Sequence, residues 1–234
     1  HSTNQTIKHT FKIATILSIM FVFSLLLVAC SNDVESTEVG SFSNITKANE
    51  HIGFSLLQSV EPDDEGNIFI SPTSALIAML MVYNGSDHET RSEIEKALKI
   101  DGLSESEVNE AARALMDTLH QKEEKIEVQI ANSLWLNENY SFIDDFEKKM
   151  NNYFAAKIDE IDIYNDASAD KINDWVNDAT NGLIEEIVEA PLPEDLLAYI
   201  INALYFNGTW QKEFNKSMTF DDIFYTENAE KEMP

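Results

Sequence analysis

The stretch NIFISPTSALIAMLMVYNG, Asn67 to Gly85, decides how this sequence is interpreted. Its first residues, Asn67–Ile70, form a short apolar segment that predicts a buried strand. Pro72 fits the first position of a helix, because the backbone N–H that proline lacks has no helical partner at that position. Ser71 is then placed to be the N-cap, and the apolar run that follows predicts a deeply buried helix to about Tyr83.

The sequence on both sides of this stretch alternates between helical and extended patterns. Apolar residues at helical spacing predict helices over residues 45–60, 89–99, 104–120, 142–154 and 167–188, the last with a break near Asn181-Gly182. Ser104 followed by Glu107 predicts a capping box. Strands are predicted over residues 126–136, 157–163 and 196–206. Helices followed by strands with long connections favour an α+β fold built on a large sheet.

Composition excludes several classes of function. The 234 residues carry 42 acidic and 16 basic side chains, a formal net charge of −26. Nucleic-acid binding needs a basic footprint, so we expect no nucleic-acid partner. We find no zinc-binding pattern of His and Cys, no P-loop and no nucleophile elbow, so we expect no catalytic residue, metal or cofactor. Carboxylate pairs are numerous, as an acidic chain of this kind makes inevitable.

Residues 1–30 have the pattern of a lipoprotein-type signal peptide. Lys8 and Lys12 precede the apolar run Ile13–Val28, and Leu27-Val28-Ala29-Cys30 resembles a bacterial lipobox. Cys30 is the only cysteine, so it has no disulfide partner, and acylation of its thiol explains its position. An uncleaved anchor helix is the alternative. Residues 31–44 are polar and are expected to form a flexible linker.

Three blocks of the sequence, in one order, resemble segments of the serpin family. Residues 67–74, NIFISPTS, resemble the family's N-x-F-x-S-P-x-S segment, which leads from a sheet-B strand into helix B. Residues 172–184, INDWVNDATNGLI, resemble I-N-x-W-V-x-x-x-T-x-G-x-I at the end of helix F. Residues 202–214, NALYFNGTWQKEF, resemble N-A-x-Y-F-x-G-x-W-x-x-x-F at the end of strand 3A. Residues 45–234 therefore resemble the N-terminal part of a serpin domain.

The resemblance implies a fold and a mechanism. The fold is a large central sheet A with surrounding helices, in a monomer. A serine or cysteine protease cleaves an exposed reactive loop, and the loop inserts into sheet A as a new strand before the acyl-enzyme hydrolyses. The protease is thereby trapped and distorted. The protein is then an inhibitor and not an enzyme, and its partners are proteases.

The resemblance also assigns roles to residues of this sequence. Sheet A parts at the shutter, and the residues matching it are Ser71, Ser74 and Asn202. The breach, where insertion begins, is matched by Gly208 and Trp210. The remaining matches are structural: Asn67, Pro72, Asn173, Thr180, Gly182, Ile184 and Phe214.

Each of these residues also has a plainer interpretation. Ser71 fits a simple N-cap, which contributes about 1 kcal/mol, and Ser74 fits a hydroxyl bonded back to its own helix. Trp210 fits an ordinary core aromatic. Asn202 is harder to explain this way, because a buried amide in an apolar strand requires hydrogen-bond partners.

In the family, the reactive-centre bond, the hinge and the shutter histidine that would pair with Asn202 follow the region matched here. We therefore expect an N-terminal fragment of a longer protein, with its fold incomplete at the C-terminus. The leader predicts an exported bacterial lipoprotein at the cell surface or envelope, with the domain facing the extracellular or periplasmic side. A non-inhibitory serpin, acting as a surface binding or chaperone-like module, is the alternative function. An enzyme or solute-binding lipoprotein is disfavoured by the absence of a catalytic constellation.

Overall fold

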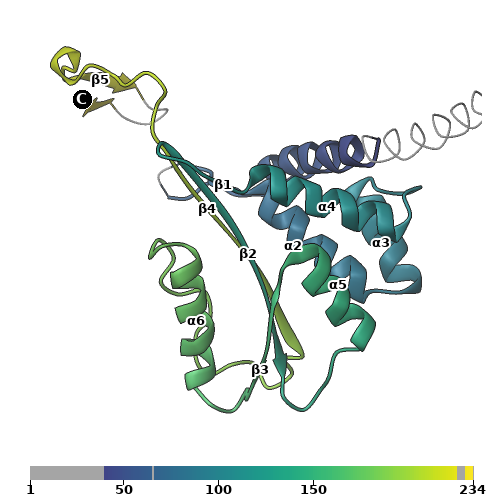
Figure 1. The fold of residues 1–234 in the computed structure, drawn as a ribbon. Coiled ribbons are helices and arrows are strands. Elements are labelled where there is room, and N and C mark those ends of the chain that lie inside the picture. Colours follow the sequence, from purple (N-terminus) through teal and green to yellow (C-terminus); the bar gives the residue numbers. More distant parts are fainter. Residues whose placement is uncertain (1–39, 65, 226–229, 234) are drawn as a thin grey trace, which may run out of the picture.

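The computed structural model describes residues 40–64, 66–225 and 230–233. Figure 1 shows two long strands that run side by side through the molecule, with a layer of helices on one face and a single helix on the other. The leader, Cys30 and residues 31–39 lie outside the described residues. Residues 40–44, expected in the flexible linker, are helical in this structure.

The sheet is built around β2 (Ile126–Asn137), which pairs with three other strands. β4 (Ala198–Gly208) runs antiparallel along almost all of it, from Ile126 opposite Gly208 to Leu136 opposite Ala198. β3 (Lys157–Ile161) pairs in parallel with the second half of β2, and β1 (Gln121–Lys122) pairs antiparallel with its start. The strands predicted over residues 126–136, 157–163 and 196–206 are therefore confirmed as β2, β3 and β4.

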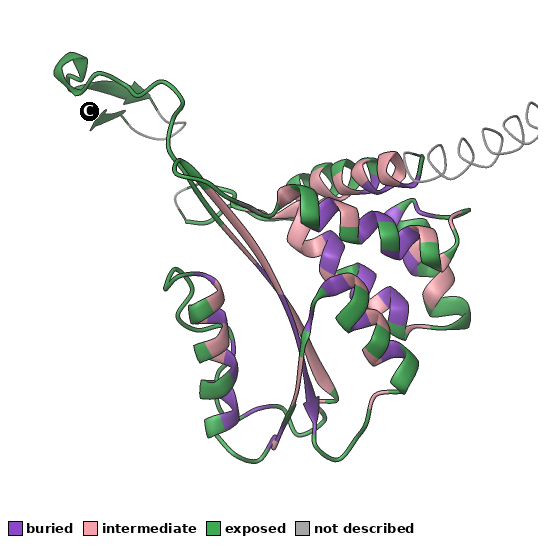
Figure 2. Cartoon of the chain, in the orientation of Figure 1, coloured by how far each residue is buried: buried purple, intermediate pink, exposed green. Residues whose placement is uncertain are grey.

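The helical layer consists of a helix over residues 40–59 and four more helices: α2 (Pro72–Gly85), α3 (His88–Leu98), α4 (Glu105–Leu119) and α5 (Asp144–Phe154). Figure 2 shows buried residues, in purple, alternating with exposed ones along these helices. The expected capping box is present, since Ser104 and Glu107 exchange both bonds. The core that these elements share includes Leu76, Ile77, Leu80, Met81, Leu134, Met150 and Phe154.

A second core lies under α6 (Ala167–Ala179), on the opposite face of the sheet. Trp135 of β2 and Ile172 of α6 are fully buried there. Trp175 packs edge-on against Trp135, with the ring centroids 6.1 Å apart and the rings inclined by 73°. α6 is therefore fixed to the sheet by aromatic and aliphatic contacts of its own.

Beyond β4, residues 209–225 and 230–233 are all exposed. They include a short 3-10 helix, η1 (Lys216–Met218), and a hairpin of β5 (Asp222–Tyr225) and β6 (Glu230–Met233). Figure 1 shows this segment extending past the end of β4, away from both cores.

Two predicted elements are wrong. Asn67–Ile70 forms no strand, because no strand lies beside it in the described part of the chain to complete a hydrogen-bonded ladder. The helix predicted over residues 167–188 ends at Ala179. The break expected near Asn181-Gly182 is confirmed, with φ 50° at Asn181 and φ 82° at Gly182, but no helix resumes over residues 183–188. Two successive residues in the left-handed region cannot continue a right-handed helix.

Candidate functional site

Two serine hydroxyls hold the junction at the start of α2. Ser71 has an extended backbone, with φ −122° and ψ 91°, and is the N-cap. The N–H of Ser74 donates to Ser71 Oγ over 3.4 Å, and the Ser71 hydroxyl donates to Ser74 Oγ over 2.9 Å. The interpretation of Ser71 as an N-cap is confirmed, and the Ser74 hydroxyl is bonded to that cap.

The residues before this junction form a closed turn. The N–H of Asn67 donates to Asp63 Oδ1 over 2.8 Å, and the N–H of Asp63 donates to the Asn67 carbonyl over 2.9 Å. Pro72 is the first residue of α2 and faces the helix over residues 40–59, where a Cβ added to Gly53 would lie 3.2 Å from Pro72 Cγ. Glycine at this position therefore allows the two helices to approach closely.

Asn202 lies in the middle of β4, directly opposite Asn132 of β2. Its Nδ2 donates to Asn132 Oδ1 over 2.7 Å, and Asn132 Nδ2 donates in turn to the Phe154 carbonyl, also over 2.7 Å. The Oδ1 atom of Asn202 is buried and accepts no hydrogen bond within the described residues. The amide of Asn202 therefore has the network that was expected, with one acceptor still unpaired.

Asn132 was not singled out from the sequence. Like Asn202, it is an amide inside a predicted strand, and it is 3% exposed. α2 packs against β4. No hydrogen bond in the described residues joins the Ser71–Ser74 pair to Asn202.

Gly208 and Trp210 lie at and just beyond the end of β4. A Cβ added to Gly208 would lie 2.8 Å from Cζ of Phe206, so the phenyl ring occupies the space of a side chain. Trp210 is 68% exposed and meets Phe214 edge-on, with ring centroids 5.6 Å apart. Trp210 is therefore not a core aromatic in the described chain.

The matched residues at the end of α6 organise the chain that follows it. Asn173 donates to the Val188 carbonyl over 2.8 Å, and its Oδ1 accepts from the N–H groups of Ile187 at 3.0 Å and Val188 at 3.1 Å. Thr180 is buried, and its hydroxyl oxygen accepts from the N–H of Ile184 over 3.0 Å. Gly182 supplies the left-handed turn between them.

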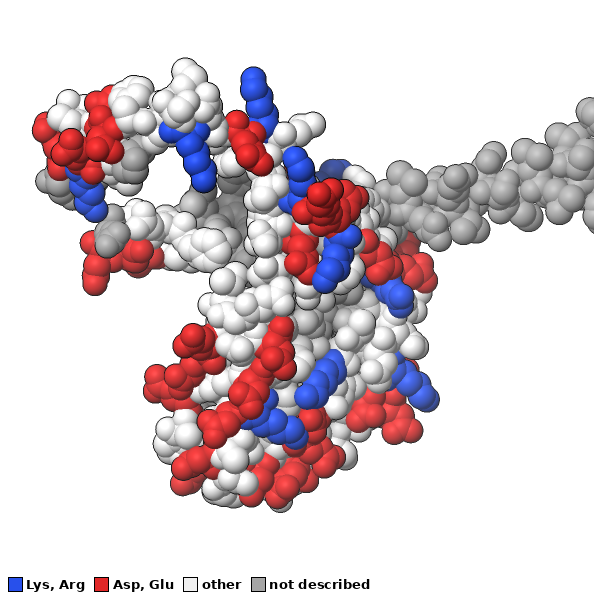
Figure 3. All heavy atoms as spheres, turned by 60° about the vertical axis from the view of Figure 1, so that its left-hand side comes forward, with Lys and Arg blue, Asp and Glu red and all other residues white. Residues whose placement is uncertain are grey.

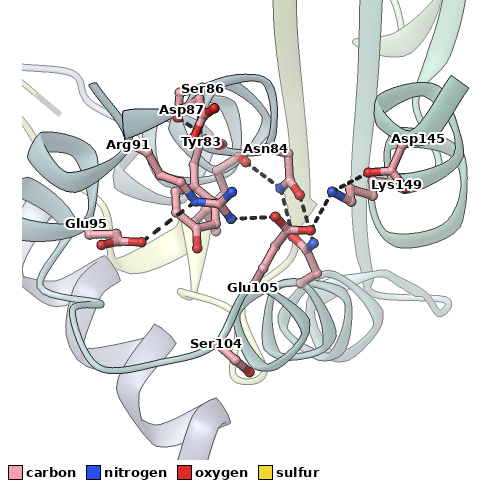
Figure 4. A network of polar contacts seen from close by, with 12 residues as sticks. Tyr83, Asn84, Ser86, Asp87, Arg91, Glu95, Ser104, Glu105, Asp145 and Lys149 are labelled. Atoms are coloured by element: carbon pink, nitrogen blue, oxygen red, sulfur yellow. Dashed lines mark hydrogen bonds and ion pairs between the residues drawn. The ribbon is translucent and has the colours of Figure 1, made fainter. Parts of the chain in front are cut away.

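A polar network between the helices was also missed by the sequence reasoning (Figure 4). Asn84 of α2 and Asn109 of α4 exchange two hydrogen bonds of 2.8 Å through their buried amides. Beside them, the Glu105 carboxylate forms ion pairs with Arg91 of α3 and Lys149 of α5. α2 is apolar on nearly every side, so periodicity alone does not mark Asn84 as part of a polar network.

Opposing effects set the protonation of this network. Burial alone would raise the pKa of the Glu105 carboxyl, but hydrogen bonds from Lys149 and Arg91 hold it below its ordinary value. Burial alone would lower the pKa of the Lys149 ammonium, but its bonds to Asp145 and Glu105 raise it. Both groups are therefore charged at neutral pH, and the network is a set of ion pairs.

The described surface carries charged side chains of both signs and several clefts. Figure 3 shows Asp and Glu side chains spread over the visible face, with Lys and Arg interspersed. Clefts of about 490, 360 and 190 Å³ are lined by neither Ser71, Ser74 nor Asn202. Within the described residues we find no group of His, Cys, Asp and Glu arranged to hold a metal, and no helix long and apolar enough to cross a membrane.

The arrangement of this sheet and its helices is that of a known class of proteins. The chain matches the serpin (serine protease inhibitor) family over residues 47–234. This protein is therefore a member of the serpin family, with a serpin fold of which the structure describes a part.

Relatives with this likeness include proteins of an archaeon, a human and a tick. An uncharacterised serpin-like protein of Methanosarcina acetivorans is 30% identical over 191 residues, which cover 80% of this chain and 44% of that protein. Human Serpin B3 is 29% identical over 200 residues, covering 78% of this chain and 51% of that protein. Iripin-1 of Ixodes ricinus is 32% identical over 179 residues, covering 75% and 46%. The chain thus spans about half the length of the curated relatives it matches.

Solved structures agree with this assignment. The thermophilic serpin tengpin in its latent state has a TM-score of 0.71 at 32% identity, covering 82% of this chain and 51% of that one. Human glycosylated kallistatin has a TM-score of 0.71 at 28% identity, covering 83% and 53%. The serpin fold expected from the three sequence blocks is confirmed.

Proposed function

We propose that the protein containing this chain inhibits serine or cysteine proteases as a suicide substrate, by inserting a cleaved reactive loop into the sheet beside β4. Serpins are generally protease inhibitors and not enzymes, which supports this proposal. The observation that carries it furthest is the amide of Asn202, whose Nδ2 is bonded across the sheet while its Oδ1 is buried and unpaired in the described chain.

Such an amide suits a strand that must exchange partners. Leaving a buried acceptor unpaired costs roughly 1–3 kcal/mol, so Asn202 favours any state in which a donor reaches it. An apolar side chain at this position would provide no such preference. In this proposal Ser71, Ser74 and Asn202 form the shutter, and Gly208 and Trp210 mark the breach where insertion starts.

The test uses the full-length protein that contains this chain and a panel of serine and cysteine proteases. An inhibitor forms a one-to-one covalent complex that survives SDS, with loss of protease activity. Cleavage of the loop without a complex by every protease that cuts it would overturn the proposal and favour the alternative, a non-inhibitory serpin acting as a binding module.

A second measurement separates loop insertion from the choice of protease. Any protease that nicks the reactive loop should raise the thermal unfolding temperature of the protein, because the inserted strand adds a full ladder of hydrogen bonds to the sheet. An unchanged unfolding temperature after complete nicking would contradict insertion, whatever the target protease is.

We also propose that Cys30 carries a lipid that anchors the exported protein at the cell surface or envelope. The support is the Leu27–Cys30 lipobox pattern after an apolar run and the absence of another cysteine in the sequence. In the parent bacterium, Cys30→Ser should leave the precursor uncleaved and without incorporated fatty acid. Normal processing of this variant would overturn the proposal.

A further inference from the structure

β3 is paired on one side only in the described part of the chain. Its residues Lys157–Ile161 run parallel to Ser133–Asn137 of β2, and no described strand lies along its other edge. A strand edge with free N–H and C=O groups is a template on which another chain can pair. The backbone groups along this edge therefore decide whether a second molecule can add to the sheet.

The register identifies which groups those are. The Ile161 carbonyl accepts from the N–H of Glu138 over 3.0 Å, so Ile161 directs its backbone groups toward β2. Successive residues of a strand direct their backbone groups to opposite sides. Ile158 and Glu160 therefore direct theirs outward.

Two side chains cover the outward groups of Glu160. Its N–H donates to Asp159 Oδ1 over 2.9 Å, and its carbonyl accepts from Lys171 Nζ of α6 over 3.1 Å. Lys171 Nζ also lies 2.9 Å from Asp159 Oδ1, which closes the group into one unit. We call these two side chains, Asp159 and Lys171, the edge cap.

The edge cap is held in place by the docking of α6. The ammonium groups of Lys171 and Lys157 lie 5.7 and 4.6 Å from the centroid of the buried Trp135 ring, so both cations contact the same aromatic ring. Burial alone would raise the pKa of Asp159, but the hydrogen bond from Lys171 and the charge of Lys157 hold it below its ordinary value. Asp159 is therefore a carboxylate at neutral pH.

We propose that the edge cap keeps this protein from self-associating through β3, and that the partner it excludes is the β3 edge of a second copy. With the cap closed, Ile158 alone offers outward backbone groups, and a single residue does not start a ladder. With the cap open, Ile158 and Glu160 both offer an outward N–H and C=O, and these groups can pair with a second strand. A half-exposed ion pair contributes little stability by itself. The effect of Asp159 and Lys171 is therefore that they occupy the backbone N–H and C=O of Glu160, which a second strand would otherwise bind. This proposal does not depend on protease inhibition.

The test measures the oligomeric state of the full-length protein by analytical ultracentrifugation. Lys171→Met keeps a long apolar stem over Trp135 but removes the donor to Glu160. We expect its apparent dimerisation constant to tighten about tenfold relative to the wild type, the equivalent of about 1.4 kcal/mol. Asp159→Ala uncovers the N–H of Glu160 by a separate route and should shift in the same direction.

Three controls isolate the edge. Lys171→Arg keeps a donor and should stay like the wild type, and Lys148→Met removes an exposed lysine from α5 with the same change in net charge and should have no effect. Adding Glu160→Pro to Lys171→Met removes the outward N–H without touching the ladder to β2, and should restore the wild-type state.

Either of two outcomes would overturn the proposal. One is that both cap variants retain the near-ultraviolet circular dichroism of the folded protein and remain as monomeric as the wild type. The other is that Lys171→Met associates equally strongly with and without Glu160→Pro, because association would then use another surface.

Discussion

At the scale of single residues, the pair Asn132–Asn202 joins the two longest strands through side chains as well as through the backbone. Asn202 donates to Asn132, and Asn132 donates to the Phe154 carbonyl at the end of α5. One amide chain thus links β4, β2 and the helical layer. Because the side chains of Asn132 and Asn202 are hydrogen-bonded to each other, their contributions to stability should depend on one another.

Asn132→Ala is expected to lower the free energy of unfolding by roughly 1–3 kcal/mol, because it leaves Asn202 Nδ2 and the Phe154 carbonyl without partners. Asn202→Ala should cost less, because its Oδ1 is already unpaired. Urea unfolding of both single variants and the double variant measures the coupling, and the double variant should cost clearly less than the sum of the singles. Additive costs would contradict a shared network, and Asn151→Ala on the exposed face of α5 is the control.

At the scale of elements, three helices meet at one carboxylate. Glu105 begins α4 and forms ion pairs with Arg91 of α3 and Lys149 of α5, while Lys149 also pairs with Asp145 one turn earlier on its own helix. A further polar contact joins two of these helices, since Arg113 of α4 donates to the Asn152 carbonyl of α5. Apolar contacts fix distance better than orientation, and these polar contacts add direction. The network therefore sets the rotation of α3 and α5 about α4.

The pH dependence of stability follows from the same carboxylate. The pKa of Glu105 in the folded protein lies below its ordinary value of 4.5. Its contribution to stability is therefore fully present above about pH 4.5 and is lost as the pH falls through the folded pKa. Unfolding free energies measured from pH 7 downward should fall less steeply for Glu105→Gln than for the wild type. Glu93→Gln, exposed on α3, is the matched control, and an equal slope in Glu105→Gln would contradict the assignment.

The connection after α6 depends on Asn173. Its amide makes three bonds to the backbone of Ile187 and Val188. Asn173→Ala should release this segment, so hydrogen exchange at the Ile187 and Val188 amides should accelerate, with a loss of about 1–3 kcal/mol in unfolding free energy. Asp174→Ala, on the exposed face of the same helix, should leave exchange unchanged. Unchanged exchange in Asn173→Ala would mean that other contacts hold the segment.

At the scale of the whole molecule, the described chain leaves large apolar side chains in solvent. Phe69 is 98% exposed, Phe214 is 75% and Trp210 is 68%. Exposed apolar surface of this extent, together with the open edge of β4, favours aggregation. Residues 31–234 expressed alone are therefore expected to be insoluble or to bind the dye ANS as a loosely packed state. A sharp, cooperative melt of a soluble monomer would refute this prediction.

The secondary structure was largely predictable, because it follows from local patterns. Periodicity and capping residues predict helices α2 to α5 and strands β2 to β4. For example, Ser104 and Glu107 predict the capping box that begins α4 in the structure. The errors occur where tertiary context decides. Residues 67–70 lack a pairing strand in the described chain. Residues 183–188, expected to be helical after the break at Asn181-Gly182, form an irregular segment whose end is bonded to Asn173.

The candidate site was predictable only through family resemblance. The three blocks identified Ser71, Ser74 and Asn202, whereas no pattern in the sequence indicated that Asn132 lies opposite Asn202. The two residues are 70 positions apart, and their register depends on the intervening chain folding into α5, β3 and α6. Long-range pairing of this kind is set by the packing of the whole sheet, which periodicity does not report.

The buried indole of Trp135 gives this molecule a natural optical probe. Trp135 lies in an apolar setting under α6 with two ammonium groups over its ring, whereas Trp210 is in solvent. Their emission spectra should therefore separate, the first toward the blue and the second toward the red. In a variant with Trp175 and Trp210 replaced by Phe, any lifting of α6 from the sheet would be read directly as a red shift in fluorescence, in real time and without a label.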